Sequence, residues 1–340
     1  MTHREEKTRF ITPDLLKGIA ILFMIQVHLM ELFALPDIFA SSKLSLFLGG
    51  PPAAPIFMII MGYFIAHSSM SKIAMLKRGV QLIIWGMLLN IGLNMHLIYR
   101  VLFESWNYNI WEYIFGVDIL QLAGLSLVVI ALLADRIKSK WYFIAAIIIA
   151  IFVLSSLING ETIPSPWNYF SAYFIGGTSW SYFPLLPWLA YPLTGYAFYK
   201  SESFFLTWSW HKYFNLFTIA GFIILMSTSW TYVSNISHHL PLYYKHKFLF
   251  YLWIIVFSLL WAGIFMIFSK RIANTKFGKY LIFLGKNITS IYVFQWLIIG
   301  NLATIWYQQK GWTELIVYFI TITLLSSSLS WAWQEIKHRK

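Results

Sequence analysis

The chain alternates long apolar runs with short polar segments along its whole length. A helix needs about 20 apolar residues to cross the hydrocarbon core of a membrane. The polar stretches between the runs are too short to fold alone, so residues 1–340 are expected to form a single integral-membrane domain. Ten runs approach the spanning length and predict about ten transmembrane helices, at residues 12–34, 52–70, 79–102, 114–134, 141–158, 182–199, 214–233, 248–268, 280–306 and 312–333.

Composition supports the same class of protein. Hydrophobic residues make up 59% of the chain and charged residues only 11%, with a mean hydropathy of +0.66. A soluble domain would need more charge on its surface. The chain contains no Cys, which excludes disulfides, thiolate metal sites and a cysteine nucleophile. We therefore expect an all-α polytopic membrane protein.

The distribution of Lys and Arg predicts which side of the membrane each loop faces, because cytoplasmic loops are enriched in both. With ten spans and both termini in the cytoplasm, only five of the 25 Lys and Arg residues fall on the outer side. Those five are Lys43, Arg100, Lys245, Lys247 and Lys310. The asymmetry accounts for most of the net charge of +12 without nucleic acid, and it favours a multi-pass protein of the cell membrane.

The first apolar run carries four ionisable side chains, which are costly inside a membrane and are functional candidates there. Asp14 and Lys17 stand near its start. His28 lies deep within the run, and Glu31 follows one turn later. Lys17 and His28 share one helical face, about 16 Å apart along the axis. Asp14 lies on that face too, about 21 Å of helix rise from His28, and its spacing also allows it to pair with Lys17.

His28 is the first candidate for chemistry, because a neutral imidazole at low dielectric is a good general base. Its orienting partner could be Glu31 on the same face, Asp118 in the fourth span or Gln295 in the ninth. Two plainer roles stay open. His28 could be a structural residue hydrogen-bonded to a neighbouring helix, and Lys17 could be an anchor at the cytoplasmic surface.

Several other signals are weaker or absent. His96 and Arg100 lie toward the outer end of the third span, where they could be interfacial or face an acceptor. The sequence has no nucleophile elbow, zinc-peptidase motif, Walker loop or dinucleotide-binding loop. His238, His239 and His246 share one outer loop without obvious acidic or sulfur ligands, so we expect no metal.

The first two spans resemble those of integral-membrane acyltransferases. The stretch DLLKGIAILFMIQVH, residues 14–28, is similar to a signature in which Asp-x-x-Arg is followed after ten residues by His. Lys17 stands where that family has Arg, and His28 stands at its His. The stretch PIFMIIMGY, residues 55–63, is similar to the family's Phe-Phe-x-x-Ser-Gly-Tyr, with Met61 where Ser is usual.

Three further segments resemble one branch of these enzymes, the heparan-α-glucosaminide N-acetyltransferases. They are FGVDILQLAGLSL at 115–127, FPLLPWLAYPLTGY at 183–196 and LGKNITSIYVFQW at 284–296. In the last of these the family usually carries His where this chain has Gln295. The resemblance therefore touches spans one, two, four, six and nine.

The resemblance implies transfer of an acyl group, often acetyl, from cytoplasmic acyl-coenzyme A to a sugar or glycan, often on the far side of the membrane. Such a transfer needs a base for the acceptor's proton, which His28 could supply. Basic side chains at the cytoplasmic mouth could bind the nucleotide of the donor, although each could equally serve topology. The candidates are His28, Glu31 and Asp14 for catalysis; Lys17, Lys72, Lys77 and Arg78 for the donor; and Asp118, Gln121 and Gln295 for the substrate.

The partners expected are membrane lipids, acyl-coenzyme A and a sugar or glycan acceptor, as in polysaccharide modification, with a homodimer left open. Neither nucleic acid nor a metal is expected. The alternative from another class is a proton-coupled transporter or flippase of a lipid or sugar, with His28 and Glu31 as a proton relay. Such transporters usually contain two halves with paired, interrupted spans. The sequence shows no such symmetry.

Overall fold

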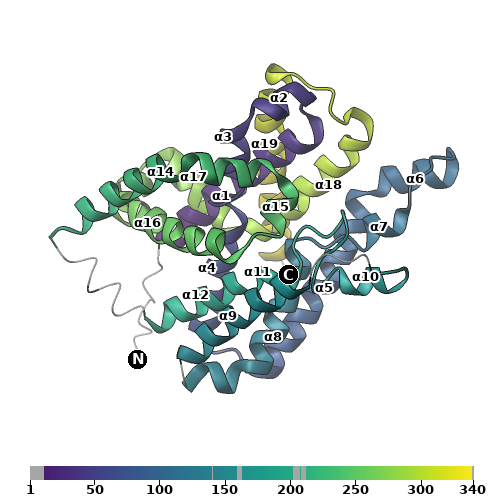
Figure 1. Ribbon diagram of the computed structural model, residues 1–340. Helices are drawn as coiled ribbons and strands as arrows, with labels where there is room; N and C mark the ends of the chain where they lie inside the picture. Colours follow the sequence, from purple (N-terminus) through teal and green to yellow (C-terminus); the bar gives the residue numbers. More distant parts are fainter. Residues whose placement is uncertain (1–10, 140, 159–162, 202–206, 208–211, 339–340) are drawn as a thin grey trace.

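The computed structural model describes residues 11–338 apart from residues 140, 159–162, 202–206 and 208–211. The described residues form helices and loops, with two isolated backbone bridges and no β-sheet. The helices are α1 (Ile11–Phe33), α2 (Pro36–Ser41), α3 (Lys43–Gly49), α4 (Ala54–His67), α5 (Lys72–Leu93), α6 (Met95–Phe103), α7 (Ile110–Ile114), α8 (Ile119–Ser139), α9 (Trp141–Leu157), α10 (Trp167–Ser171), α11 (Leu185–Trp188), α12 (Ala190–Lys200), α14 (Phe214–His238), α15 (Leu240–Tyr244), α16 (Phe248–Ala273), α17 (Lys276–Lys286), α18 (Ile288–Trp306) and α19 (Trp312–His338) (Figure 1).

Seven helical segments of the described chain are long and apolar enough to cross a membrane, and the pair α5–α6, bent by 56°, would be an eighth. The predicted all-α polytopic membrane fold is thus confirmed. Each of the ten apolar runs coincides with a helix or a helix pair. However, α9 and α12 have only 17 and 11 residues, fewer than the usual span of about 20. The number of spans and the side of each terminus stay predictions.

Three of the predicted runs are interrupted, each for a local reason. The third run breaks at Asn94 and the ninth at Asn287, and each amide donates to the carbonyl one turn earlier, at 2.9 and 3.0 Å. Amides that bond to nearby backbone compete with the helix. In the sixth run Leu186 leaves the helical conformation, because the residue before a proline is disfavoured in the α region.

Helix α1 lies at the centre of the fold, packed against α3, α4, α16, α17, α18 and α19 (Figure 1). Two glycines allow α17 to touch its first half. A Cβ on Gly18 would lie 2.0 Å from the carbonyl oxygen of Leu281. A Cβ on Gly285 would lie 1.9 Å from that of Asp14. This backbone contact fixes the end of α1 that carries Asp14 and Lys17.

A second packed group contains α4, α5, α8, α9 and α12. Helices α4 and α12 again meet through glycines. A Cβ on Gly62 of α4 would lie 1.9 Å from the carbonyl oxygen of Pro192 in α12, and a Cβ on Gly195 of α12 would lie 1.8 Å from that of Ile59 in α4. The chain before α8 is tied to the loop between α10 and α11, since the Val117 amide donates to the Trp180 carbonyl at 3.0 Å. This arrangement places Asp118, immediately before α8, beside the cavity described next.

Candidate active site

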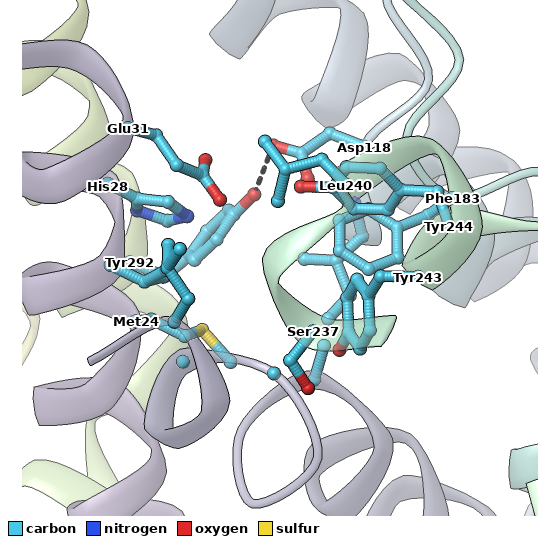
Figure 2. Close-up of a pocket in the computed structure, with 16 residues that line it drawn as sticks. Met24, His28, Glu31, Asp118, Phe183, Ser237, Leu240, Tyr243, Tyr244 and Tyr292 are labelled. Atoms are coloured by element: carbon cyan, nitrogen blue, oxygen red, sulfur yellow. Dashed lines mark hydrogen bonds between the residues drawn. The ribbon is translucent and has the colours of Figure 1, made fainter. Parts of the chain in front are cut away.

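A cavity of about 30 Å³ lies between α1, the start of α8 and the segment that contains α15 (Figure 2). That volume holds about one or two water molecules. An acyl thioester and an acceptor would therefore fit only after side chains around the cavity rotate. The cavity is lined by Met24, Val27, His28, Glu31, Leu46, Gly49, Gly50, Ala54, Asp118, Ile119, Phe183, Ser237, Leu240, Tyr243, Tyr244 and Tyr292.

His28 and Glu31 face this cavity from successive turns of α1 (Figure 2). The imidazole of His28 packs on the indole of Trp296 in α18, with ring centroids 4.1 Å apart and planes tilted by 33°. Among the described residues, Nδ1 of His28 has no hydrogen-bond partner. Polar groups buried without partners are costly, which is why they usually mark function inside a membrane.

Asp118 reaches the same cavity from the beginning of α8. Its Oδ2 accepts a hydrogen bond from the Tyr292 hydroxyl at 2.5 Å, and its Oδ1 accepts from the Ile119 amide at 2.7 Å. Gln121 holds the turn in place, because its Oε1 accepts from the Asp118 amide at 3.2 Å and its Nε2 donates to the Gly116 carbonyl at 3.2 Å. The bond from the Asp118 amide to the Gln121 side chain is one half of a helix capping box. The bonds from Tyr292 and Ile119 fix the direction of the Asp118 carboxylate.

The wall opposite α1 includes α15, which is anchored from outside the cavity. The indole of Trp188 donates to the Tyr244 carbonyl at 2.8 Å. Nδ1 of His246 lies 2.8 Å from the Tyr243 carbonyl and Nε2 lies 2.7 Å from the Tyr191 hydroxyl. Because a carbonyl only accepts, Nδ1 carries the proton and Nε2 accepts from Tyr191. These three bonds fix the backbone that carries Tyr243 and Tyr244.

Asp14 and Lys17 lie at the other end of α1 and do not line the cavity. Their side chains form an ion pair, with Nζ and Oδ1 2.9 Å apart, as the i, i+3 spacing allowed. The Lys17 ammonium also lies 5.6 Å from the ring centroid of Phe64 in α4. The structure thus does not bring Asp14 to His28. Its catalytic role and the donor role of Lys17 stay predictions.

The other predicted donor-binding residues lie on the first turns of α5. Lys72, Lys77 and Arg78 are all exposed. The ammonium of Lys72 lies 3.7 Å from a carboxylate oxygen of Asp135 in α8. None of the three lines the cavity. They form a basic surface, and their role toward a nucleotide also stays a prediction.

The two glutamines that were predicted to bind the substrate, Gln121 and Gln295, do not line the cavity as Asp118 does. Gln121 is fully buried and engaged in the capping bonds described above, so the structure makes it a support for Asp118. Gln295 is also fully buried, one turn beyond Tyr292 in α18, and does not line the cavity. Within the described part of the chain neither of its amide atoms has a hydrogen-bond partner.

Three other histidines, His238, His239 and His96, each form a hydrogen bond away from the cavity. Nε2 of His238 lies 3.1 Å from the Ala40 carbonyl, and Nδ1 of His239 lies 3.0 Å from the Asn235 carbonyl. His96 accepts from Nε of Arg100 at 3.3 Å, away from the cavity. Over the residues that the structure describes, no three His, Asp or Glu side chains gather as metal ligands.

Several lining residues were not predicted from the sequence. Tyr292 lies inside the segment 284–296 that suggested the family, but nothing in that segment singles out its hydroxyl. Ser237 lies in the last turn of α14 and Tyr243 lies in α15, near a predicted membrane interface, where Tyr is a common residue. No periodicity distinguishes them, and their position became visible only when the helices were packed together.

The fold and the site together define a polytopic membrane protein with a histidine and two carboxylates around one cavity. The protein-family model described as heparan-alpha-glucosaminide N-acetyltransferase, catalytic, matches residues 9–223, more than half of the chain. The chain belongs to this family, as the motifs suggested, and membership indicates acyltransferase activity in a membrane protein. Searches among curated proteins and among solved structures found no significant match.

Only some of the residues that line the cavity lie within the range that the family model matches. His28, Glu31, Asp118 and Phe183 lie within residues 9–223. The residues of α14, α15 and α18 that complete the cavity follow the matched range.

Proposed function

We propose that the protein transfers an acetyl or other acyl group from cytoplasmic acyl-coenzyme A to a sugar or glycan acceptor, with His28 as the general base. The observation that supports this most strongly is the meeting of His28, Glu31 and Asp118 at one cavity, in a chain of an acetyltransferase family. Two successive turns of α1 and the start of α8 supply these groups.

The chemistry follows from the nature of these side chains. A hydroxyl or amine of the acceptor attacks the carbonyl carbon of the thioester, and its proton passes to an imidazole nitrogen of His28. The carbonyl π electrons move to oxygen and give a tetrahedral oxyanion. When the oxyanion collapses, the C–S bond breaks and the departing coenzyme A sulfur takes the proton back from the imidazolium. Glu31, one turn away, favours the imidazolium when its carboxyl group is ionised.

The donor would approach from the end of α1 that carries Lys17. That position lies about 16 Å of helix rise from His28. The exposed Lys72, Lys77 and Arg78 would contribute charge-assisted hydrogen bonds to the phosphates of the nucleotide. The transporter alternative gains no support from the structure or from the family match.

The test is acyl transfer by the purified protein in detergent, with acetyl-coenzyme A and a panel of amino sugars and glycans. Thiol release reports turnover, and mass spectrometry of the acceptor reports the transferred group. We expect an acetylated product that depends on both substrates. His67, exposed on α4, offers a control, since His67→Ala should leave turnover unchanged. A folded protein that acylates no acceptor in the panel, yet moves protons or sugars across a liposome membrane, would support the transporter instead.

A further inference from the structure

Two hydroxyl groups face the cavity without a partner of their own. Ser237 lies at the last turn of α14 and Tyr243 lies in α15. Their side chains are buried, with exposed fractions of 2% and 4%. Among the residues that the structure describes, no group hydrogen-bonds to Oγ of Ser237 or to the Tyr243 hydroxyl. Figure 2 shows both on the side of the cavity away from His28 and Glu31.

Several other polar groups of the cavity are poorly suited to stabilise a negative charge. Glu31 and Asp118 are acidic side chains, which repel an oxyanion when ionised. The Tyr292 hydroxyl already donates to Asp118, and the Gly50 amide already donates to carbonyls of α3. Ser237 and Tyr243 contribute buried hydroxyls to the lining that have no partner among the described residues, and both can donate to a developing negative charge.

We propose that Ser237 and Tyr243 are the oxyanion-stabilising residues of the acyl transfer. This inference rests on the proposed function. As the acceptor attacks and His28 takes its proton, the thioester carbonyl oxygen gains the negative charge. It does so on the side of the cavity away from the two carboxylates. Both hydroxyls donate to it there and release it when the C–S bond breaks. Donors aimed at the charge of the transition state usually contribute more than any other single effect.

The hydrogen bonds that hold the backbone at Tyr243 support this role, because such donors act best when the protein already fixes their position. Its own carbonyl accepts from His246, and the next carbonyl accepts from Trp188. Ser237 lies in the last turn of a 25-residue helix. Ser237 and Tyr243 both lie after residues 9–223, so the family match does not include these two donors.

The test uses Ser237→Ala and Tyr243→Phe in the full-length protein, with acetyl-coenzyme A and an acceptor that the wild type acetylates. Removing one such donor lowers kcat by about 10²-fold or more. We expect that loss in each variant, with the KM of both substrates changed less than about twofold, because the hydroxyls act in the transition state. Thermal stability should be unchanged or higher, since each change deletes an unpaired buried hydroxyl.

Two matched controls lie close by in the fold. Ser234, one turn earlier in α14, is equally buried, and its hydroxyl donates to the Thr231 carbonyl at 3.3 Å. Tyr251 is buried in α16, with its hydroxyl bonded to Thr194. Neither lines the cavity. Ser234→Ala and Tyr251→Phe should keep wild-type kcat.

The outcomes separate this inference from the proposed function. If the wild type transfers acetyl groups and both variants keep its kcat, the oxyanion role is wrong while the acyltransferase stands. A raised acceptor KM at unchanged kcat would also overturn it, in favour of acceptor binding. If the wild type transfers nothing, the proposed function fails first and this inference with it. Should Ser237→Ala not fold, Ser237→Cys, whose thiol is a weak donor, is expected to show the same loss of kcat.

Discussion

The hydrogen bond from Tyr292 to Asp118 should contribute measurably to stability. It joins α18 to the start of α8 across 174 residues of sequence, at 2.5 Å, and Tyr292 is only 5% exposed. Hydrogen bonds to charged groups contribute about 1.5–3 kcal/mol, compared with about 0.5–1.5 kcal/mol for neutral pairs. We therefore predict a coupling free energy of about 1.5–3 kcal/mol between the two side chains.

A double-mutant cycle measures this coupling free energy directly. The free energies of unfolding of the wild type, Tyr292→Phe, Asp118→Ala and the double variant are compared by SDS titration in mixed micelles, followed by circular dichroism. Asp118→Ala also loses the hydrogen bond that the Ile119 amide donates to Asp118. The single Asp118 variant and the double variant share this loss, so it cancels in the cycle.

A neutral pair elsewhere in the fold provides the control. The hydroxyls of Tyr280 in α17 and Ser327 in α19 are 2.8 Å apart. The cycle of Tyr280→Phe with Ser327→Ala should give the smaller coupling expected of neutral groups, about 0.5–1.5 kcal/mol. Distant sites are additive within about 0.5 kcal/mol. Coupling below that limit for the Tyr292–Asp118 pair would refute the reasoning, and so would a value no larger than that of the control pair.

Three further predictions concern topology, packing and the donor. The chain contains no Cys, so a single introduced cysteine is the only residue that a thiol reagent labels. A cysteine that replaces the exposed Asn107 should react with an impermeant reagent from outside, and one that replaces the exposed Ser69 should not. Gly62→Ala should lower the thermal midpoint, because its Cβ would lie 1.9 Å from a carbonyl oxygen of α12 and overpacking costs about 1–3 kcal/mol. Replacing Lys77 and Arg78 together by Gln should weaken acetyl-coenzyme A binding, measured by calorimetry, and reduce its dependence on salt.

Each of these has a control and an opposing result. The reverse labelling pattern would overturn the orientation. For packing, Gly311→Ala is the control, because its Cβ would lie an ordinary 3.4 Å from a side-chain oxygen of Glu314. An equal thermal midpoint for the Gly62 and Gly311 variants would contradict the account. For the donor, Lys276 and Lys279 are exposed on α17. Their double replacement removes the same charge elsewhere, and equal donor binding in the two double variants would show that Lys77 and Arg78 serve topology alone.

Local arrangements were predictable from the sequence, because helical geometry fixes them. His28 and Glu31 are one turn apart on an apolar run, and the pairing of Asp14 with Lys17 follows from its i, i+3 spacing. Asp118 was also a candidate, since an acidic residue at an apolar run is rare. The breaks at Asn94 and Asn287 were not predicted, because a polar residue inside an apolar run can equally face a neighbouring helix.

Contacts between distant segments could not be predicted in this way. Tyr292 meets Asp118, and Ser237 faces the same cavity as His28, only because the helices pack around α1. Gln121 is a further example, since its side chain caps the turn before α8, which its place in the sequence did not indicate. Its predicted role toward the substrate stays a prediction. A single sequence gives the residue types of a site but not which of several polar side chains turn toward it.

The central claim is that His28 acts as the base of an acyl transfer, and single-turnover acetylation by His28→Ala tests it most directly. The assay uses saturating acceptor, with acetyl-coenzyme A affinity and thermal stability measured on the same preparation. We predict at least a 10²-fold slower transfer, the usual loss for a general base. Donor affinity should be nearly unchanged, because the Lys17 end of α1 lies about 16 Å of helix rise away. A stable His28→Ala protein that transfers acetyl groups at the wild-type rate would contradict the account.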